Sequence, residues 1–277
     1  MAFISYAQNF EDVMLWRALK HVPRGRYVDI GAQHPVVDSV SKAFYEHGWR
    51  GVHVEPVPQY ADLLRLDRPD ETVLQVAFSD REGMLELKVF KNTGLSTAVE
   101  AYAQQHATNP AFTAEGLLTP MLQMKTALAS LNGQDVHWLK IDVEGLEEQV
   151  LRGWDSTVLR PWIILIEATV PTSTELNYEA ADHIIIEAGY IFVYFDGLNR
   201  FYVAPEHPEL IDAFASPPNV FDEFALSGLA SSEMCKVVQE RHRDEIQASQ
   251  QETSELQFRF NALQKNIRVV KAEMSDL

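Results

Sequence analysis

The stretch LKIDVEGLE, from Leu139 to Glu147, decides the fold because it reads as an apolar strand that ends on two carboxylates. Asp142 and Glu144 follow the apolar residues directly, and Gly145 comes behind them. A strand that is apolar almost throughout is typical of a parallel sheet covered on both faces. Ligands bind at the ends of such strands, so we expect these two acids to lie at a site.

Working outward, four further runs share this pattern of short apolar segments bounded by polar or turn residues. They are YVDIGA (Tyr27 to Ala32), RGVHVEP (Arg50 to Pro56), TVLQVAFS (Thr72 to Ser79) and WIILIEAT (Trp162 to Thr169). Helical patterns fall between them, at Asp38 to His47, Gln59 to Leu66 and Leu146 to Arg152. This alternation predicts a doubly wound α/β domain, with a parallel sheet and helices on both faces.

The segment YIFVYFDGLNRFYVAP, from Tyr190 to Pro205, has a different pattern. Two strand-like runs lie on either side of a short loop, Asp196 to Asn199, whose residues suit a hairpin. We expect an antiparallel pair that closes the sheet. A further hairpin is expected around Met84 to Phe90, and the weakly patterned segment from Asn92 to Gln134 is interpreted as helices and loop over the carboxyl edge.

The composition fits one large α/β domain with an appendage. The chain has 277 residues, of which 46% are hydrophobic, enough for a packed core. Its net charge of −17 repels phosphate backbones, so nucleic acid is not an expected partner. Cys235 is the single cysteine, which excludes an internal disulfide and favours a reducing, cytoplasmic compartment.

The sequence predicts no membrane-spanning segment, because no window of about 18 uninterrupted apolar residues occurs. The first residues, MAFISYAQNFED, lack a basic region and turn acidic at once, which argues against a signal peptide. We expect a protein of the cytoplasm, either free or at the inner face of the membrane beside glycan-assembly enzymes.

After Ser231 the chain changes character, since neither Pro nor Gly occurs from there to its last residue. Apolar residues recur at alternating spacings of four and three, the a/d seam of a coiled coil. The seam consists of Leu256, Phe260, Leu263, Ile267, Val270, Met274 and Leu277. We therefore expect a globular domain over residues 1–230 and, over residues 231–277, a coiled-coil helix that forms a homodimer or homotrimer. A helix packed on its own domain is the alternative, and a seam that runs to the last residue allows for a longer native chain.

In open α/β sheets, the carboxyl ends of the strands form the ligand crevice. The predicted strands deliver to this edge Asp29, Gly31, Ala32, Gln33, His34, Glu55, Pro56, Ala77, Phe78, Asp142, Glu144 and Glu167. This set is rich in acids and contains no Lys or Arg, which suits a cationic ligand.

Gly31 and Glu55 point to a nucleoside. A glycine after the first strand permits a tight turn, and an acid 24 residues later matches the carboxylate that binds ribose hydroxyls. The turn lacks the further glycines of the dinucleotide fingerprint, Pro35 removes a backbone donor, and no P-loop lysine is present. The edge therefore suits an adenosine without phosphates, and S-adenosylmethionine is a cationic ligand of this kind.

Seven motifs in order carry a resemblance to a known family. They are SYAQNFED, VDIGAQHP, GWRGVHVEP, GLSTA, LKIDVEGLEEQVLRGW, IEAT and FVYFDGLNRFYV, and they lie roughly between Ser5 and Asp222. Together they resemble the FkbM family of S-adenosylmethionine-dependent methyltransferases. Many members carry a second glycine where this chain has His34-Pro35.

The resemblance implies the class I methyltransferase fold, a Rossmann-like, mostly parallel sheet of seven strands that ends in an antiparallel hairpin. It also implies O-methylation of a sugar or similar hydroxyl, in polysaccharide, lipopolysaccharide or natural-product pathways. Glycosyltransferases are then the expected neighbouring enzymes. The coiled coil would set the distance between this domain and those enzymes.

Methyl transfer to a hydroxyl needs an aligned acceptor and a base. Asp142 and Glu144 can share one face of the strand end, and two close carboxylates raise each other's pKa, which suits one of them as the base. His34 is a third candidate base, with a structural role as its alternative. The alternatives for the acids are a contact of Asp142 with the cofactor's ammonium group and a helix cap for Glu144. A further alternative is a divalent cation held by both acids and Glu167.

The resemblance implies additional site residues. It adds Gln8 and Asp12 to the cofactor contacts, and Ser96, Thr97, Glu167, Asn199 and Arg200 to the substrate pocket. Helix capping and ordinary turn chemistry are the alternatives for most of these positions.

Two rival functions remain open from the sequence. An NAD(P)-dependent oxidoreductase would share the sheet and Glu55, although the glycine fingerprint is missing. A non-catalytic, degenerate methyltransferase module presented by its coiled coil would share every feature above except turnover.

Overall fold

The computed structural model describes residues 3–90, 94–109 and 113–275, with side chains up to residue 264. By its internal contacts the chain divides into two units, residues 1–230 and 231–277. The larger unit combines strands and helices, which confirms the α/β class.

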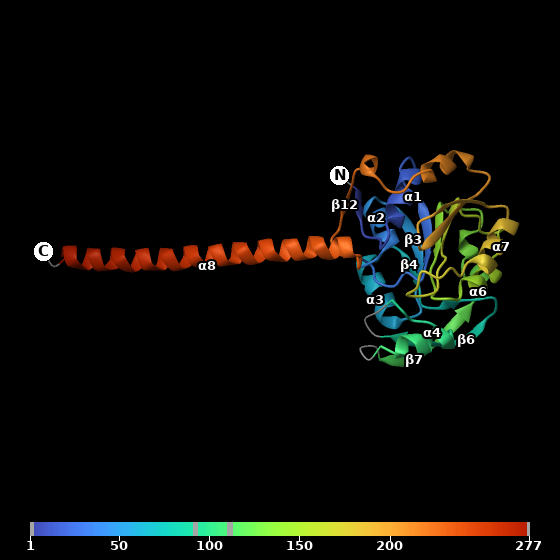
Figure 1. The fold of residues 1–277 in the computed structure, drawn as a ribbon, viewed down its shortest axis with the longest axis horizontal. Helices are drawn as coiled ribbons and strands as arrows, with labels where there is room; N and C mark the ends of the chain where they lie inside the picture. Colours follow the sequence, from blue (N-terminus) through green and yellow to red (C-terminus); the bar gives the residue numbers. More distant parts are fainter. Residues whose placement is uncertain (1–2, 91–93, 110–112, 276–277) are drawn as a thin grey trace. The chain divides into compact units, whose positions relative to one another are not determined.

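Among the described residues, seven strands build the main sheet in the order β10, β11, β9, β8, β2, β3, β4. In that order their bounds are Ile191–Phe195, Asn199–Val203, Ile163–Glu167, Trp138–Ile141, Arg26–Ile30, Arg50–Val54 and Thr72–Leu74. Figure 1 labels the neighbours β3 and β4 of this sheet. Parallel pairing joins β9, β8, β2, β3 and β4. β11 runs antiparallel to both β9 and β10, so β10 and β11 form the expected hairpin.

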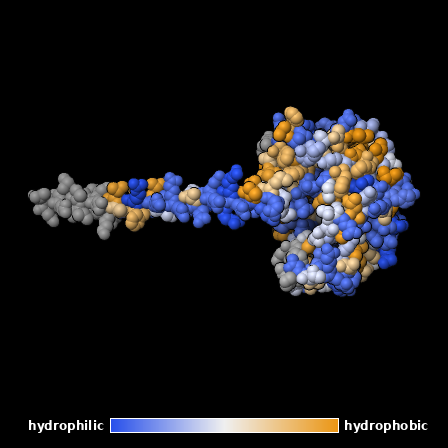
Figure 2. Space-filling model, viewed as in Figure 1, coloured by the Kyte–Doolittle hydropathy of each residue, from blue (hydrophilic) through white to orange (hydrophobic). Residues whose placement is uncertain are grey.

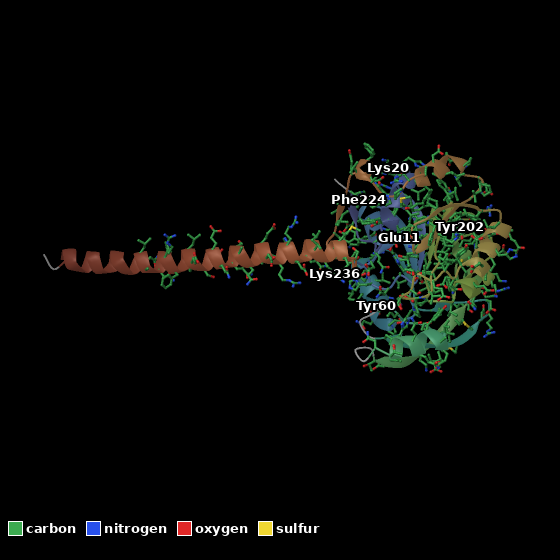
Figure 3. All side chains as sticks on the ribbon, viewed as in Figure 1. Glu11, Lys20, Tyr60, Tyr202, Phe224 and Lys236 are labelled. Atoms are coloured by element: carbon green, nitrogen blue, oxygen red, sulfur yellow. The ribbon has the colours of Figure 1, made fainter. Side chains whose placement is uncertain are left out.

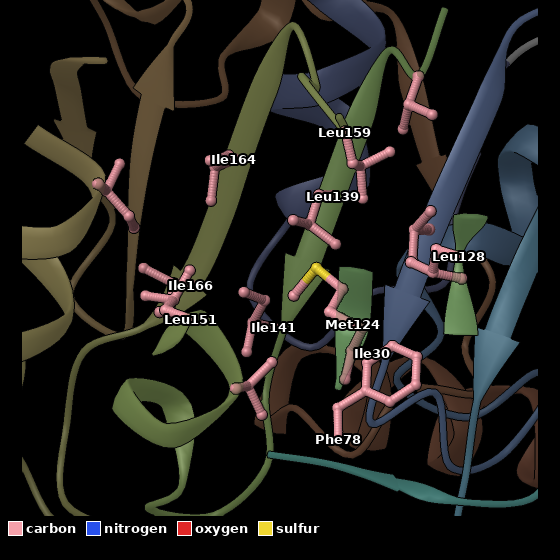
Figure 4. Packing of buried hydrophobic residues seen from close by; sticks show 14 of the residues in the cluster. Ile30, Phe78, Met124, Leu128, Leu139, Ile141, Leu151, Leu159, Ile164 and Ile166 are labelled. Carbon is pink, nitrogen blue, oxygen red and sulfur yellow. The ribbon is translucent and has the colours of Figure 1, made fainter. Parts of the chain in front are cut away.

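Helices cover both faces of this sheet. One face carries α1 (Glu11–Leu19), α2 (Val40–Glu46) and the 3-10 helix η2 (Pro208–Phe214), whose apolar residues share one buried cluster. The other face carries α5 (Met124–Ala127), α6 (Glu147–Arg152) and α7 (Glu179–Glu187). Figure 4 shows the core under this second group, which includes Ile141 and Ile166 of neighbouring strands and Met124 of α5.

Strand alternation places the polar residues of the edge. In β8, Trp138 belongs to the cluster under α1 and α2, whereas Leu139 and Ile141 belong to the opposite cluster. Since successive side chains point to opposite faces, Lys140 and Asp142 lie on the α1 and α2 face. Glu167 follows the same rule at the end of β9, because Ile166 faces the other way.

The predicted third strand is wrong in its second half. Only Thr72–Leu74 (β4) joins the main sheet, and α3 (Pro58–Asp67) precedes it. Ala77–Phe78 (β5) belongs instead to a separate sheet of three strands in the order β5, β7, β6. The backbone N–H of Glu55 donates to the carbonyl of Leu74, and beyond this bond the chain leaves the main sheet to pair with β7.

The rest of this small sheet corrects two other expectations. The strand expected near residues 84–90 is β6 (Gly83–Phe90), but its antiparallel partner is the distant β7 (Ala114–Leu122) rather than a local hairpin strand. The segment interpreted as helices and loop therefore contains a long strand between α4 (Glu100–Ala107) and α5, followed by η1 (Ala129–Leu131). The exposed residues of β6 and β7 explain why no buried-strand pattern was visible.

A parallel pair, β1 (Phe3–Ser5) and β12 (Phe224–Leu226), and the turn η3 (Val220–Asp222) complete the larger unit. The smaller unit holds one helix, α8 (Glu233–Ser275), of 43 residues. Its described surface is mostly hydrophilic, with hydrophobic residues among the polar ones (Figure 2). The side chains of the seam residues Ile267, Val270, Met274 and Leu277 lie outside the described residues. In the described part of the chain, no helix combines the length and the apolar character needed to cross a bilayer.

Candidate functional site

Four acids gather where β8 and β9 end, and we call them the carboxylate cluster. Asp142 and Glu144 follow β8, Glu147 begins α6, and Glu167 ends β9. Burial raises the pKa of Glu144 to about 9, and the charges of Asp142 and Glu147 add to the effect. Burial, followed by the charges of the other three acids, also raises the pKa of Glu167 well above its usual range. At neutral pH the cluster therefore retains protons.

Two carboxylate oxygens of this cluster are buried without a hydrogen bond. They are Oε2 of Glu144 and Oε2 of Glu167, neither of which has a partner in the described part of the chain. A buried polar atom without a partner is costly, and such atoms are rare in folded proteins. These two oxygens are the natural acceptors for a donor that a ligand would bring.

Lys140 is the cation of this site, and the sequence reasoning missed it. Its Nζ lies 2.8 Å from Oδ2 of Asp142, and the residue is only 7% exposed. Burial disfavours the charged lysine, but Asp142 and Asp29 overcome this and raise its pKa. The prediction considered only the residues that follow each strand, whereas Lys140 lies within β8. Because alternate residues of a strand share a face, the sequence could have placed Lys140 beside Asp142.

The turn after β8 is tightly held. Glu144 has φ 55° and Gly145 has φ 99°, both in the left-handed region. Oε1 of Glu147 accepts from the backbone N–H groups of Val143 (3.0 Å) and Gly145 (3.2 Å). Glu147 thus caps this turn, so the expectation of a capping role for Glu144 is wrong, and the carboxyl of Glu144 is left for another use.

Thr97 supports the same turn. Its Oγ1 donates to the carbonyl oxygen of Glu144 (2.8 Å) and accepts from the backbone N–H of Val99 (3.0 Å). The residue is fully buried. Its hydroxyl therefore positions the backbone of Glu144. This differs from the expected role of Thr97, which was to line the substrate pocket directly.

Tyr102 of α4 covers the turn. A Cβ built at Gly145 would lie 2.3 Å from Cε2 of the Tyr102 ring, so only glycine allows this approach. Nδ2 of Asn177 donates to the Tyr102 hydroxyl at 3.3 Å, which ties α4 to the segment after β9. Tyr102 is a further residue of the site that the sequence reasoning missed, since the helix carrying it has no strong pattern.

At the neighbouring strand ends, Glu55 organises the predicted nucleoside turn. Its two carboxylate oxygens accept from the backbone N–H groups of Gln33 and Val57, both at 2.8 Å. Burial raises the pKa of Glu55 to about 7. The acid predicted to bind ribose thus lies beside the turn that follows β2.

Gly31 forms the predicted tight turn, and it also makes room for the neighbouring strand end. Its φ is 79°, and a Cβ built there would lie 1.7 Å from the carbonyl oxygen of Asp142. The missing side chain makes room for the neighbouring strand end.

Asp29 presents a third unpartnered oxygen. Oδ2 accepts from the hydroxyl of Ser41 at 2.6 Å, whereas Oδ1 is buried and has no hydrogen bond among the described residues. Asp29 also lies opposite Lys140 in the register of β2 and β8. The predicted cofactor residue is therefore adjacent to the cation of the carboxylate cluster.

Comparison with known proteins identifies the family. A family model described as the methyltransferase FkbM domain matches residues 29–212, more than half of the chain. The chain belongs to the FkbM methyltransferase family. No curated protein matches it.

Two solved structures are similar to this FkbM domain. One is a TehB-like SAM-dependent methyltransferase from Corynebacterium glutamicum, with 9% identity over 69% of this chain and 87% of that chain, at a TM-score of 0.36. The other is an O-methyltransferase from Bacillus cereus in complex with SAH, with 10% identity over 73% and 84%, at a TM-score of 0.37. Both TM-scores are low, so the assignment of the family depends on the family model alone.

His34 of the FkbM domain does not have the geometry of a base. Its Nδ1 accepts from the backbone N–H groups of Val36 and Val37, both at 3.0 Å. Burial lowers its pKa, and the acids that act on it are Asp67 and Asp38 rather than the carboxylate cluster. The structural alternative therefore accounts for His34.

Asp12 is also used within the chain. It accepts from the hydroxyl of Ser5 (2.7 Å) and from the backbone N–H groups of Tyr6 (2.8 Å) and Ala7 (3.3 Å). Burial raises its pKa to about 6. These bonds fix the segment before α1, whereas α1 itself has no side-chain cap, so the capping alternative is wrong for Asp12 and its cofactor contact stays a prediction. Gln8 is exposed.

Asn199 holds the hairpin loop to α1. Its Nδ2 donates to Oε1 of Glu11 at 2.9 Å and to Oδ2 of Asp196 at 3.1 Å. Glu11 is labelled in Figure 3. Asn199 also pairs with Glu167 in the register of β11 and β9, so it borders the carboxylate cluster, although both bonds of its amide are internal.

Arg200 faces away from the cluster, which corrects its predicted role. Its guanidinium donates to Oδ1 of Asp182 (2.9 Å) and to the hydroxyl of Tyr202 (2.8 Å), which Figure 3 labels. It also packs on the rings of Phe192 and Tyr178, with centroid distances of 3.8 and 4.0 Å. Neighbouring residues of a strand point to opposite faces, so Asn199 and Arg200 cannot serve one pocket side by side.

The other predicted site residues lie in different environments. Phe78 is a core residue, and Ala77 beside it is buried in the small sheet. Ala32 follows the turn at Gly31, and Pro56 is half-buried next to Glu55. The backbone N–H of Ser96 donates to the carbonyl of Gly94. Within the described residues, no group of three or more His, Cys, Asp or Glu side chains is placed to hold a metal ion.

Proposed function

We propose that this FkbM domain transfers a methyl group from S-adenosylmethionine to a hydroxyl group, with a saccharide as the acceptor. The observation that carries this proposal is the carboxylate cluster beside the turn that Glu55 organises. It combines unpartnered acceptor oxygens with acids of raised pKa at one edge of the sheet. Raised pKa values in a partly enclosed site are typical of catalytic acids and bases.

The residues of this edge fit the cofactor. Oδ1 of Asp29 is a buried acceptor without a donor, and each oxygen of Glu55 has a further lone pair beyond its one backbone bond. An acidic set of this kind suits ribose hydroxyls and an ammonium or sulfonium charge. When bound, S-adenosylmethionine supplies the electrophilic methyl group.

The chain itself supplies the base, and Glu144 is the residue we assign to it. Asp142 is paired with Lys140, so its carboxylate already has a cationic partner and is less available to accept a proton from the acceptor hydroxyl. Glu144 has a buried oxygen without a partner and a strongly raised pKa. The backbone of Glu144 is in the left-handed region, and the hydrogen bond from Thr97 holds it there. This backbone conformation sets the direction of the Glu144 carboxyl. Glu167 would share the proton or orient the acceptor hydroxyl.

Calorimetric titration with S-adenosylmethionine tests the cofactor assignment. We expect binding to the full chain, with an affinity at least about tenfold lower in Glu55→Gln, because a hydrogen bond to a charged group contributes about 1.5–3 kcal/mol. Glu82→Gln is the matched control, since Glu82 is exposed on the same unit. Absence of binding, or equal affinities in all three proteins, would refute the assignment. Thermal unfolding of each variant shows that the fold is kept.

The rival functions give different outcomes. An oxidoreductase would change NADH fluorescence on mixing. A non-catalytic module would bind S-adenosylmethionine but produce no S-adenosylhomocysteine with any glycan extract. Added EDTA tests the divalent-cation alternative, because a metal-assisted reaction would lose its rate.

We also propose that α8 is a coiled coil that assembles two or three copies of the chain. Of the predicted seam, Leu256, Phe260 and Leu263 are more than half exposed, so a partner helix would bury them. Sedimentation of the chain with and without residues 231–277 tests this. An unchanged mass per particle, after correction for the deleted residues, would refute it. A cytoplasmic location near glycosyltransferases belongs to the same proposal.

A further inference from the structure

A hollow of about 420 Å³ lies at the opposite edge of the main sheet, where β2, β3 and β8 begin. We call it the arginine pocket after its lining residues Arg24, Arg26 and Arg50, which it shares with Asp135 and His137. No member of the carboxylate cluster lines it. Three arginines in one hollow are a local exception in a chain whose net charge is −17.

Two of these arginines have guanidinium groups to spare. Arg24 is exposed and has neither a hydrogen bond nor an ion pair with any described residue. Arg26 uses its side chain for one bond, from Nη1 to the backbone carbonyl of Asp135 at 3.3 Å. Their remaining N–H groups are therefore free for a ligand.

Arg50 forms a fixed wall instead. Its Nε pairs with Oδ2 of Asp70 at 2.5 Å, and its Nη1 donates to the carbonyl of Trp49 at 2.6 Å. The guanidinium also stacks over the Tyr45 ring at 4.4 Å. Because Asp70 balances this charge, the positive excess of the pocket comes from Arg24 and Arg26.

His137 contributes a neutral donor. Its Nδ1 accepts from the backbone N–H of Arg26 at 3.0 Å, and its ring packs against Trp49 and Trp162. Burial lowers its pKa, so at neutral pH the ring is uncharged and its proton is on Nε2. Asp135 is the one acid among the lining residues of the described chain, and it opposes an anion there.

We propose that the arginine pocket binds a small molecule through a phosphate monoester group. Guanidinium groups fit phosphate and carboxylate oxygens in a forked, bidentate geometry. The guanidinium of Arg24, the remaining N–H groups of Arg26 and the Nε2–H of His137 outnumber the roughly four acceptor sites of a carboxylate. A phosphate, with three terminal oxygens and a second charge, matches them better. The volume exceeds that of a bare phosphate ion, so the ligand has room for an organic part of sugar size.

Calorimetry on the full chain tests the proposal with glucose 1-phosphate, and separately with inorganic phosphate and glucuronate. We expect glucose 1-phosphate to bind most tightly. Glucuronate should bind at least about tenfold more weakly, because losing one hydrogen bond to a charged group changes the affinity by about that factor. No heat at about 10 mM glucose 1-phosphate, or tighter binding of glucuronate, would overturn the proposal.

Four variants make the test specific. Arg24→Gln should weaken binding of glucose 1-phosphate about tenfold or more, and Asp135→Asn should tighten it, because a like charge is removed. Arg81→Gln is the matched control, an exposed arginine outside the pocket. Equal weakening in Arg24→Gln and Arg81→Gln would show general attraction and overturn the assigned pocket. Glu55→Gln should leave this affinity unchanged, so the outcome is independent of the proposed methyl transfer.

Discussion

Two groups of buried charges lie on the same face of the main sheet, and they differ in how their charges are matched. One is the carboxylate cluster at the ends of β8 and β9. The other, which we call the buried ion network, extends from β2 and β3 to α2 and the segment before β4, and it consists of Asp29, Ser41, His53, Arg68 and Glu71. Asp29 and His53 are opposite each other in the register of β2 and β3.

The network contains cations as well as acids, although Oδ1 of Asp29, Nδ1 of His53 and Nε of Arg68 have no hydrogen bond among the described residues. Glu71 accepts from the hydroxyl of Tyr27 (2.6 Å) and contacts Nε2 of His53 (2.7 Å). Arg68, fully buried, donates to the hydroxyl of Ser41 at 2.7 Å and to the carbonyl of Pro35 at 2.6 Å. In the cluster, by contrast, three of the four acids lack a cationic partner among the described residues, since Lys140 serves Asp142.

The difference separates structural acids from functional ones. A buried acid with a cation and several donors holds elements together, and losing its partner is costly. A buried acid without a partner lowers stability, so its presence indicates a use outside the folding of the chain. The predictions below test this division, in order of expected size.

The largest effect is expected from Glu144→Gln. Loss of a general base lowers the rate by about 10²–10⁴-fold, with little change in the affinity for S-adenosylmethionine. The readout is release of S-adenosylhomocysteine with a glycan extract that supports turnover. Glu148→Gln on α6, where Glu148 pairs with exposed Arg152, is the control and should keep full activity. Full activity of Glu144→Gln would remove Glu144 from the mechanism.

In the network, Arg68→Met should destabilise the protein by about 3–5 kcal/mol, because it leaves Glu71 buried without its cation. Urea denaturation gives the free energy of unfolding. Lys42→Met is the matched control. Its partner Asp67 is partly exposed, so about 1 kcal/mol or less is expected. If Arg68→Met lowered the free energy of unfolding no more than Lys42→Met does, the buried ion network would not stabilise the fold.

Much of the fold could be predicted from the sequence, and the reasons are local. β8 and β9 are continuous apolar runs, so they were recognisable, as was the β10 and β11 hairpin around its turn residues. The strand at residues 72–79 was recognised as β but not as divided between two sheets. That division depends on pairing with β7, more than 40 residues away, which no local pattern reveals.

The site could be predicted only in part, because some of its residues come together only in the folded sheet. The edge residues Glu55, Asp142, Glu144 and Glu167 follow from the ends of strands, and the structure brings them to one edge. Lys140 and Arg200 were misjudged because side-chain alternation was not applied to them. The arginine pocket joins residues near positions 24, 50 and 137, which only the folded sheet brings together.

The pH dependence of stability measures the buried acids with raised pKa values together. Burial raises the pKa of Asp12 to about 6, of Glu55 to about 7 and of Glu144 to about 9, so the folded chain binds more protons than the unfolded chain. The free energy of unfolding therefore falls as the pH rises from about 4, where these carboxyls lose their protons in the unfolded chain, to about 9, by about 1.4 kcal/mol or more. Urea denaturation at several pH values gives the profile. Glu144→Gln cannot lose a proton and should flatten it, whereas an unchanged slope would contradict the raised pKa of Glu144.

The smallest effect tests how the cluster is held in place. Thr97→Val removes the hydrogen bond to the carbonyl of Glu144 and should cost about 1 kcal/mol of stability, the usual net value of one such bond. Because that bond fixes the left-handed turn, the rate of methyl transfer should fall while the affinity for S-adenosylmethionine stays the same. Thr97→Ser keeps the hydroxyl and should restore both stability and rate. If Thr97→Val kept the full rate, the position of the Glu144 carboxyl would not depend on this turn, and the strain at Glu144 would have no part in its function.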